Sequence, residues 1–453
     1  MNPTIQKEFA TDIVQRLRGA GHTALWAGGC VRDLLMGIEP LDYDVATSAT
    51  PEQVRELFGY RRTLPVGVAF GVVIVLGKPS QALQVEVATF RTDAAYSDGR
   101  HPDAVVFSTP QEDAQRRDFT INGMFYDPLA EAVIDYVGGQ ADLQRGCLRA
   151  IGCADDRIGE DKLRMLRAVR FSARFGFAIE AATRQAIARH AAEVNCVSGE
   201  RIWTEISKTL QTSRAAWAVE EWCDLNLLQH ILPELNAVWP QQRLASRRLL
   251  DSLDEASASA SDGPIALSQQ REAQQRPADW LDRLCGLFWI AAEHIAAENA
   301  SSLEVHLEPM VQSLKARLKV PNQVGDALRF VLPAQRELVG AQRRPWSQVQ
   351  PWLVDDCADR AVALFEARLS LMQDASQAAA WSDTIEWLHQ KLALPREQLD
   401  PAPLLLGHDL IAVGLAPSPR FRELLSRARQ RQLDQLLPNR PAALAWLAEQ
   451  VRP

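Results

Sequence analysis

The sequence predicts an α+β protein, in which a mixed N-terminal part with a sheet and helices is followed by a long helical part. Strand-length apolar runs, rich in Val and Ala, recur up to about residue 145. After about residue 150 such runs nearly vanish, and apolar residues recur at spacings of three and four, as on the buried face of a helix. A chain of 453 residues is also too long for one hydrophobic core, which indicates about two to four domains.

The composition excludes several classes of protein. Hydrophobic residues make up 47% and charged residues 23%, as in an ordinary globular protein, and no stretch approaches the roughly 18 uncharged apolar residues that a membrane span needs. The N-terminal sequence MNPTIQKEFATDIVQRL lacks an apolar signal core and predicts an amphipathic helix. The seven cysteines are scattered, and their spacing suits neither a zinc site nor a disulfide framework, so we expect free thiols in a reducing cytoplasm.

The charge of the chain is unevenly distributed. A net charge of −8 argues against bulk, non-specific binding of nucleic acid but leaves room for a local basic groove. Basic residues cluster at 162–174 and again at 420–431. Each cluster is typical of a solvated helix face, and contact with RNA is the alternative.

The N-terminal part contains six runs that predict strands. Between the second and third runs, TSATPEQVRELFG predicts a helix, because Thr50 can cap it, Pro51 suits its first turn and Gln53 completes a capping box. The six runs are TALWAGG (23–29), DYDVAT (42–47), AFGVVIVLG (69–77), LQVEVATF (83–90), AVVFS (104–108) and AVIDYVG (132–138).

The helical part is interrupted once. Residues 252–278 are rich in Ser, Ala and Gln, which predicts a disordered linker or excursion. Helical periodicity resumes with DWLDRLCGLFWIAAEHIAAE and continues to the end of the sequence.

Two aspartates on a predicted strand raise the question of function. Asp42 and Asp44 are two residues apart, so their side chains leave the strand on the same face, where like charges repel unless a cation lies between them. Oxygen ligands favour Mg²⁺, which also takes ligands from substrate phosphates. Glu86, on a later predicted strand, is a candidate third acid. The alternative for this pair is an ordinary surface feature.

A second motif precedes the aspartates. Gly28 and Gly29 lack side chains, so the backbone can approach a triphosphate, and Arg32 adds positive charge. Together with two metal-binding carboxylates, this layout suits phosphoryl or nucleotidyl transfer.

The stretch RRDFTINGMFYD (116–127) carries a third group of polar residues. Asp118 and Asn122 are four apart and share one face if the segment is helical. Arg116 and Arg117 could clamp phosphates, while the aspartate and the asparagine could hold sugar hydroxyls. The alternative is the N-terminus of a helix with its acidic cap.

Four motifs, in this order and spacing, resemble one family. GGCVRD (28–33), DYDVAT (42–47), RRDFTINGM (116–124) and GEDKLRMLRAVRFSARFGF (159–177) are similar to the bacterial class II tRNA nucleotidyltransferases, which are the CCA-adding enzymes and share a superfamily with bacterial poly(A) polymerases. The resemblance is dense over about 20–235 and returns at 404–447. One departure is Gly123, where the family pattern leads us to expect alanine.

The resemblance implies a domain order. It implies a polymerase-β-like nucleotidyltransferase head at 1–145 and a helical neck with a base-template motif at 146–238. It also implies a helical body at 239–395, containing 252–278, and a tRNA-binding helical tail at 396–453.

The resemblance also implies residue roles. Asp42 and Asp44 match the catalytic, metal-binding carboxylates. The nucleotide-binding positions are Gly28, Gly29, Arg32 and Asp33 in the first motif, Arg117, Asp118 and Asn122 for ribose and triphosphate, and Glu160, Asp161 and Arg164 in the E-D-x-x-R motif that acts as template for the incoming base.

The template role agrees with the chemistry of the bases. Asp161 and Arg164 are three apart and would share a helix face. Cytosine and adenine each present an amine donor beside a ring-nitrogen acceptor, which a carboxylate and a guanidinium can pair with. Uracil and guanine present the reverse pattern and would leave polar groups unpaired. The alternative is a surface ion pair.

The expected activity is the template-independent addition of C and A to tRNA 3′ ends from CTP and ATP, with Mg²⁺ as cofactor and pyrophosphate as product. The segment 91–113 is similar to the flexible loop that the family associates with A addition, which argues against an enzyme that adds only CC. The alternatives are a poly(A) polymerase, an enzyme that adds only the terminal A and, remotely, an inactive RNA-binding protein. The expected partners are tRNA, CTP and ATP, with no membrane.

Overall fold

The structure is a computed structural model that describes residues 3–67, 71–78, 82–93, 105–258 and 278–451. These residues form two compact units, Met1–Pro233 and Glu234–Pro453. The expected division into four domains stays a prediction.

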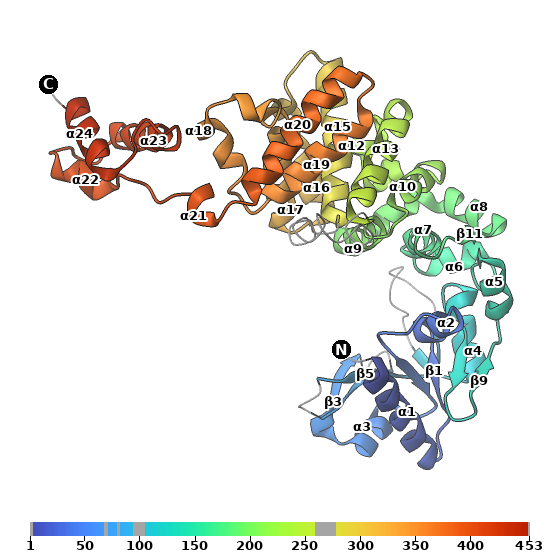
Figure 1. Cartoon of the computed structure of the whole chain (residues 1–453). Helices are drawn as coiled ribbons and strands as arrows, with labels where there is room; N and C mark the ends of the chain where they lie inside the picture. Colours follow the sequence, from blue (N-terminus) through green and yellow to red (C-terminus); the bar gives the residue numbers. More distant parts are fainter. Residues whose placement is uncertain (1–2, 68–70, 79–81, 94–104, 259–277, 452–453) are drawn as a thin grey trace, which may run out of the picture. The chain divides into compact units, whose positions relative to one another are not determined.

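The first unit is built on a seven-stranded mixed sheet (Figure 1). Neighbouring strands are antiparallel except β2 and β5, which are parallel, with Val45 opposite Val87. In spatial order the strands are β3 (Thr63–Gly67), β4 (Val72–Leu76), β5 (Gln84–Thr89), β2 (Asp44–Thr47), β1 (Ala24–Ala27), β8 (Phe125–Asp127) and β9 (Ala132–Ile134).

Most of these strands follow the predicted runs. The sequence reasoning missed β3 and β8, and also β6 (Arg91–Asp93), which pairs with β7 (Val105–Phe107) in a separate two-stranded sheet. Strand β3 contains Pro65, and its Leu64 and Val66 are exposed. It therefore lacks the alternation of apolar and polar residues that marks a half-buried strand. The expected flexible loop falls mainly on residues 94–104, which lie outside the described residues.

Helices complete the N-terminal part. The predicted amphipathic helix is α1 (Pro3–Gly19), whose buried Ile13 and Leu17 pack in one core cluster with Trp26 and Val87 of the sheet. The predicted cap of α3 (Pro51–Phe58) is confirmed, since Thr50 and Gln53 form a reciprocal capping box. The other short helices here are α2 (Gly29–Leu35), α4 (Pro110–Gln115) and α5 (Gly139–Arg145).

After residue 150 the first unit is helical, as predicted. One short strand, β11 (Ala178–Ile179), is the exception among the described residues of this region, and it pairs with β10 (Cys147–Leu148), which precedes residue 150. The main helices are α6 (Ala154–Glu160), α7 (Arg164–Phe175), α8 (Ala181–His190), α9 (Gly199–Leu210), α10 (Ala215–Asp224) and α11 (Leu228–Ile231).

The described part of the second unit consists of helices joined by turns (Figure 1). None of the described helices in the chain is long and apolar enough to cross a membrane. The main helices of the second unit are α12 (Pro233–Asn236), α13 (Trp239–Ala258), α15 (Trp280–Glu298), α16 (Leu303–Leu318), α17 (Asn322–Glu337), α18 (Trp346–Val349), α19 (Ala358–Ala367), α20 (Ala375–Leu392), α21 (Arg396–Leu399), α22 (Gly407–Ala412), α23 (Pro419–Leu433) and α24 (Arg440–Val451).

The predicted linker at 252–278 is wrong at its N-terminal end. Residues 252–258 continue α13, because Leu253 is buried and Asp254 accepts a hydrogen bond of 2.8 Å from Nε of Arg283 on α15. Residues 259–277 lie outside the described residues. The seven cysteines all lie within the described residues, and none of them forms a disulfide.

Candidate active site

Two acidic residues mark the start of β2. Asp44 is its first residue and Asp42 precedes it, so the strand is shorter than the predicted run at 42–47. Tyr43 between them is buried, whereas both aspartates are exposed. The alternation places the two carboxylates on the same side, as their spacing predicts.

Glu86 joins the aspartates through the register of the sheet. Val45 of β2 lies opposite Val87 of β5 in a parallel pair, so Asp44 and Glu86, one residue earlier on each strand, are also neighbours. Although part of Asp44 is exposed, the protein packed around its carboxylate desolvates it and raises its pKa to about 6. The negative charges of Glu86 and Asp42 add to this effect, and the Arg117 guanidinium opposes it. We call Asp42, Asp44 and Glu86 the acidic edge.

The two glycines of the first motif have different surroundings. Gly28 follows β1 with φ 73°, and a Cβ at this position would lie 3.0 Å from Nη1 of Arg117. Gly28 therefore allows both the turn and the close approach of an arginine. Gly29 begins α2, where a Cβ would lie 3.6 Å from Nη2 of Arg32, an ordinary contact.

A chain of hydrogen bonds connects α2 to α7. Arg32 is buried, donates to Oδ1 of Asp33 from both Nε and Nη2 at 2.8 and 2.6 Å, and donates from Nη1 to Oδ1 of Asn122 at 2.6 Å. Asn122 donates to Oδ1 of Asp118 at 3.1 Å, and Nε of Arg167 donates to Oδ2 of Asp118 at 2.9 Å. Asp118 and Asn122 do meet, but through the short 3₁₀ helix η3 (Thr120–Asn122) and not on an α-helix.

The charge of Asp118 is stabilised by its partners. Burial alone would raise its pKa, but the Arg167 guanidinium and the hydrogen bonds from Arg167 and Asn122 outweigh burial and lower the pKa to about 2. Asp118 is thus an ionised carboxylate inside the protein, paired with a helix of the later, helical region.

A buried aspartate holds the two arginines of the third motif. Nη2 of Arg116 lies 2.8 Å from Oδ1 of Asp113, and Nη2 of Arg117 lies 3.0 Å from Oδ2. Burial raises the pKa of Asp113, but the two guanidinium groups overcome this effect and hold the pKa below its usual range. Both arginines are therefore positioned by a residue that the sequence reasoning missed, although an acid three and four residues earlier is a readable signal.

The E-D-x-x-R motif does not lie on one helix face, so that prediction is wrong. Helix α6 ends at Glu160, Asp161 has extended backbone angles (φ −141°, ψ 107°), and α7 begins at Arg164. We call residues 160–164 the template turn. Asp161 and Arg164 still lie on the same turn, because the N–H of Arg164 donates to the carbonyl of Asp161 at 3.1 Å.

In the template turn, Glu160, Asp161 and Arg164 are each held by an ion pair. Nη1 of Arg164 lies 2.6 Å from Oε2 of Glu160. Oδ1 of Asp161 accepts from the N–H of Leu163 at 3.0 Å, and Oδ2 accepts from Nη2 of Arg201 on α9 at 2.8 Å. The sequence reasoning missed Arg201, which is 40 residues away in the chain and carries no local signal.

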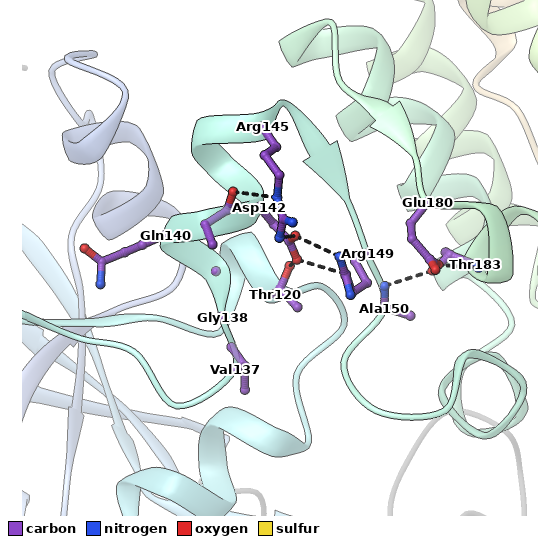
Figure 2. Close-up of polar contacts among 12 residues, drawn as sticks. Thr120, Val137, Gly138, Gln140, Asp142, Arg145, Arg149, Ala150, Glu180 and Thr183 are labelled. Atoms are coloured by element: carbon purple, nitrogen blue, oxygen red, sulfur yellow. Dashed lines mark hydrogen bonds and ion pairs between the residues drawn. The ribbon is translucent and has the colours of Figure 1, made fainter.

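The buried carboxylate of Asp142 holds the start of η3 in place (Figure 2). Oδ2 of Asp142, on α5, accepts from Oγ1 of Thr120 at 2.8 Å, and Arg145 and Arg149 pair with the same carboxylate. Gly139, also on α5, packs tightly here, since a Cβ would lie only 2.3 Å from the carbonyl oxygen of Thr120. These contacts fix the segment that carries Asp118 and Asn122.

The unexpected glycine of the third motif has a packing explanation. A Cβ at Gly123 would lie 2.8 Å from Val137 and 2.9 Å from Ile151. In this chain the two branched side chains occupy the space that an alanine would need.

Two protein families match segments of the chain. A family described as the poly A polymerase head domain matches residues 24–149. A family described as a probable RNA and SrmB-binding site of polymerase A matches residues 176–238.

Individual relatives give the same result. A CCA-adding enzyme of Latilactobacillus sakei is 30% identical over 98% of this chain and 99% of its own length. A CCA-adding enzyme of Lactiplantibacillus plantarum is 44% identical over 45% of this chain, and poly(A) polymerase I of Escherichia coli is 40% identical over 50%. The aligned part spans 49% and 50% of those two relatives, about half of each.

Solved structures share the fold. A CCA-adding enzyme of Bacillus stearothermophilus, solved in complex with CTP, matches 99% of this chain and 98% of its own with a TM-score of 0.70 and 27% identity. A Thermotoga maritima CCA-adding enzyme, solved with tRNA, has a TM-score of 0.64 at 20% identity, covering 100% of this chain and 97% of its own, which is evidence for the fold alone.

The pairing of Asp118 predicts a pH-dependent stability. Because its pKa is lowered from 3.8 to about 2 on folding, the ion pair stabilises the protein above pH 4 and is lost as the pH falls through 2. We expect Asp118→Asn to lower the free energy of unfolding by about 2 kcal/mol at pH 7, with the deficit shrinking between pH 4 and pH 2. Thermal unfolding across this pH range measures the effect.

The matched control for this prediction is Asp12→Asn, which changes an exposed aspartate on α1 in the same unit. We expect that variant to unfold like the unmodified protein. A constant deficit of Asp118→Asn at every pH would contradict the assignment of the stability to this ionised carboxylate.

Proposed function

The chain belongs to the family of CCA-adding enzymes and bacterial poly(A) polymerases, and from this premise we propose that it adds C and A to tRNA 3′ ends. CTP and ATP are the substrates, no nucleic-acid template is used, and pyrophosphate is released. The observation that carries the proposal is the alignment with the CCA-adding enzyme of Latilactobacillus sakei, which runs through the second unit as well as the first. The CTP complex of the Bacillus stearothermophilus relative supports the choice of nucleotide.

The acidic edge suits a divalent metal, and we propose Mg²⁺. Its side chains offer only oxygen donors, which Mg²⁺ prefers. In the described part of the chain, no three acidic, histidine or cysteine side chains are gathered tightly enough to form a ready-made metal site. Asp42 and Asp44, with help from Glu86, would therefore hold the ion together with phosphate oxygens of the nucleotide. When bound, Mg²⁺ would neutralise charge that develops on those oxygens during transfer.

The surrounding residues position the nucleotide in this proposal. Arg117 lies beside Gly28 and close enough to Asp44 to lower its pKa, so it can reach phosphates held at the acidic edge. Asp118 and Asn122 already have partners within the protein, since they bond to Arg167 and Arg32. The main role of Asp118 and Asn122 is therefore to hold these two arginines in position. Direct contact of the two side chains with the ribose contributes less to nucleotide binding.

The template turn selects the base. In the proposed complex, Asp161 accepts a hydrogen bond from the exocyclic amine of cytosine or adenine, and Arg164 donates to the ring nitrogen. Glu160 and Arg201 fix the two groups at 2.6 and 2.8 Å, so the pattern of donor and acceptor is set before the base arrives. UTP and GTP would leave these groups without a partner on the base. Each unpaired group would weaken the binding of the wrong nucleotide by about 1–3 kcal/mol, and this loss is the source of the discrimination.

A poly(A) polymerase is the second candidate, because poly(A) polymerase I of Escherichia coli is 40% identical over half of the chain. An enzyme that adds only the terminal A is the third, since the template turn suits C and A alike. The deciding experiment is nucleotide addition to three tRNA transcripts that end before CCA, after C and after CC, with CTP, ATP or both.

We expect two C additions, one A addition and then a stop. Activity only on the transcript that ends in CC would make the protein an A-adding enzyme. A long ladder of A on any RNA end would make it a poly(A) polymerase. No transfer to any of these RNAs would refute the enzymatic proposal.

The acidic edge yields a prediction about metal binding. We expect millimolar Mg²⁺ to raise the thermal unfolding temperature at pH 7.5, because the ion relieves repulsion among the carboxylates. Asp44→Asn should abolish this rise and lower the rate of nucleotide addition by at least about a thousandfold. Asp12→Asn, the exposed control, should keep both properties. An unchanged Mg²⁺ effect in Asp44→Asn would contradict the site.

The template turn yields a prediction about selectivity. We expect Arg164→Ala to lose the preference for CTP and ATP over UTP and GTP, while some nucleotide transfer remains. Arg201→Gln should raise the KM for CTP and ATP and reduce discrimination by about fivefold to fiftyfold, because it frees Asp161. Arg201→Lys should restore part of the loss, since it keeps the positive charge. Full rejection of UTP by Arg164→Ala would refute the assignment.

A further inference from the structure

The first unit contains a basic pocket outside the acidic edge and the template turn. Its cavity volume is about 430 Å³. It lies where helix α7 meets the C-terminal end of α9 and the segment that leads to α10, and none of its lining residues is acidic. The lining residues are Arg170, Arg174, Lys208, Gln211, Thr212 and Ser213, which together define the basic pocket.

The charges of the pocket are only partly compensated. Arg170 is neutralised by the buried Glu205, whose Oε2 lies 2.6 Å from its Nε. Nη2 of Arg174 is 3.6 Å from Oδ2 of Asp33, but 47% of its side chain is exposed. Lys208 is exposed and forms no ion pair within the described ranges. The pocket therefore keeps a net positive charge next to the Gln211 amide and the Ser213 hydroxyl, which can donate hydrogen bonds, whereas the Thr212 hydroxyl already donates to the carbonyl of Thr209 at 2.8 Å.

Helix α7 runs from the template turn to the pocket. Arg164, Arg167, Arg170 and Arg174 recur every three or four residues, so they lie along one side of α7. Arg164 belongs to the template turn, whereas Arg174 lines the pocket and approaches Asp33 of the first motif. About 15 Å of helix separates the first arginine from the last. An RNA strand that ends at the template turn would cover that length within a few nucleotides.

We propose that the basic pocket binds a backbone phosphate of the RNA whose 3′ end is extended, a proposal that rests on the proposed function. Guanidinium, ammonium, amide and hydroxyl donors are the groups that recognise phosphate oxygens. The lining offers neither an aromatic ring to stack on a base nor a carboxylate to accept from one. The contact is therefore independent of sequence, and it positions the strand without taking part in the choice of nucleotide.

The test compares Lys208→Gln with Lys7→Gln, which changes an exposed lysine on α1 of the same unit. Binding of a tRNA transcript without CCA to the full chain is measured by fluorescence anisotropy at several KCl concentrations. We expect Lys208→Gln to weaken binding by about fivefold and to make the dependence of log K on log[KCl] shallower by about one unit. Lys208→Arg should bind like the unmodified protein, and binding of CTP should stay unchanged in all variants.

Two results would overturn the proposal. Unchanged RNA affinity and salt dependence in Lys208→Gln would mean that the pocket is only a solvated surface. Weaker binding of CTP or pyrophosphate with unchanged RNA binding would assign the pocket to the nucleotide. RNA binding is measured separately from nucleotide transfer. If Lys208→Gln weakens RNA binding as expected but the unmodified protein transfers no nucleotide, the proposed function is refuted and the RNA contact is still supported.

Discussion

The ion pair between Asp118 and Arg167 is the interaction on which the candidate site depends. It joins the segment that precedes strand β8 to helix α7, and Asn122 extends it to Arg32 on α2. Because Asp118 is buried, its charge is tolerated only with a partner, so each side of the pair fixes the other. The first motif, the third motif and the helix that begins at the template turn are thereby held in one arrangement.

The acidic edge imposes the opposite constraint. Desolvation raises the pKa of Asp44, and the negative charges of the neighbouring Glu86 and Asp42 add to this effect. Within the described residues, none of these three carboxylates has an ion pair of the kind that Asp113 and Asp118 have. This contrast separates acids that hold arginines in place from acids that are kept available for a cation, and such unfavourable clusters are typical of functional sites.

Local patterns in the sequence were sufficient for much of this protein. The period of the apolar residues predicts the change from a sheet to helices near residue 150, and the capping box at Thr50 predicts the start of α3. The spacing of Asp42 and Asp44 predicts that both leave the chain on one side, because side chains alternate along an extended backbone. Strand β3 escaped prediction, since its exposed Leu64 and Val66 do not show that alternation.

The sequence by itself determined the kinds of residue and the order of the motifs, because those depend on neighbours in the chain. Only the tertiary structure decided which residues meet. Val45 and Val87 set Asp44 beside Glu86, and Arg201 reaches Asp161 from another helix. The tertiary structure also decided that the template turn lies between two helices. Asp161 takes an extended conformation there, and its carboxylate accepts two hydrogen bonds. Contacts between distant segments depend on packing and electrostatics of the whole unit, which no local pattern encodes.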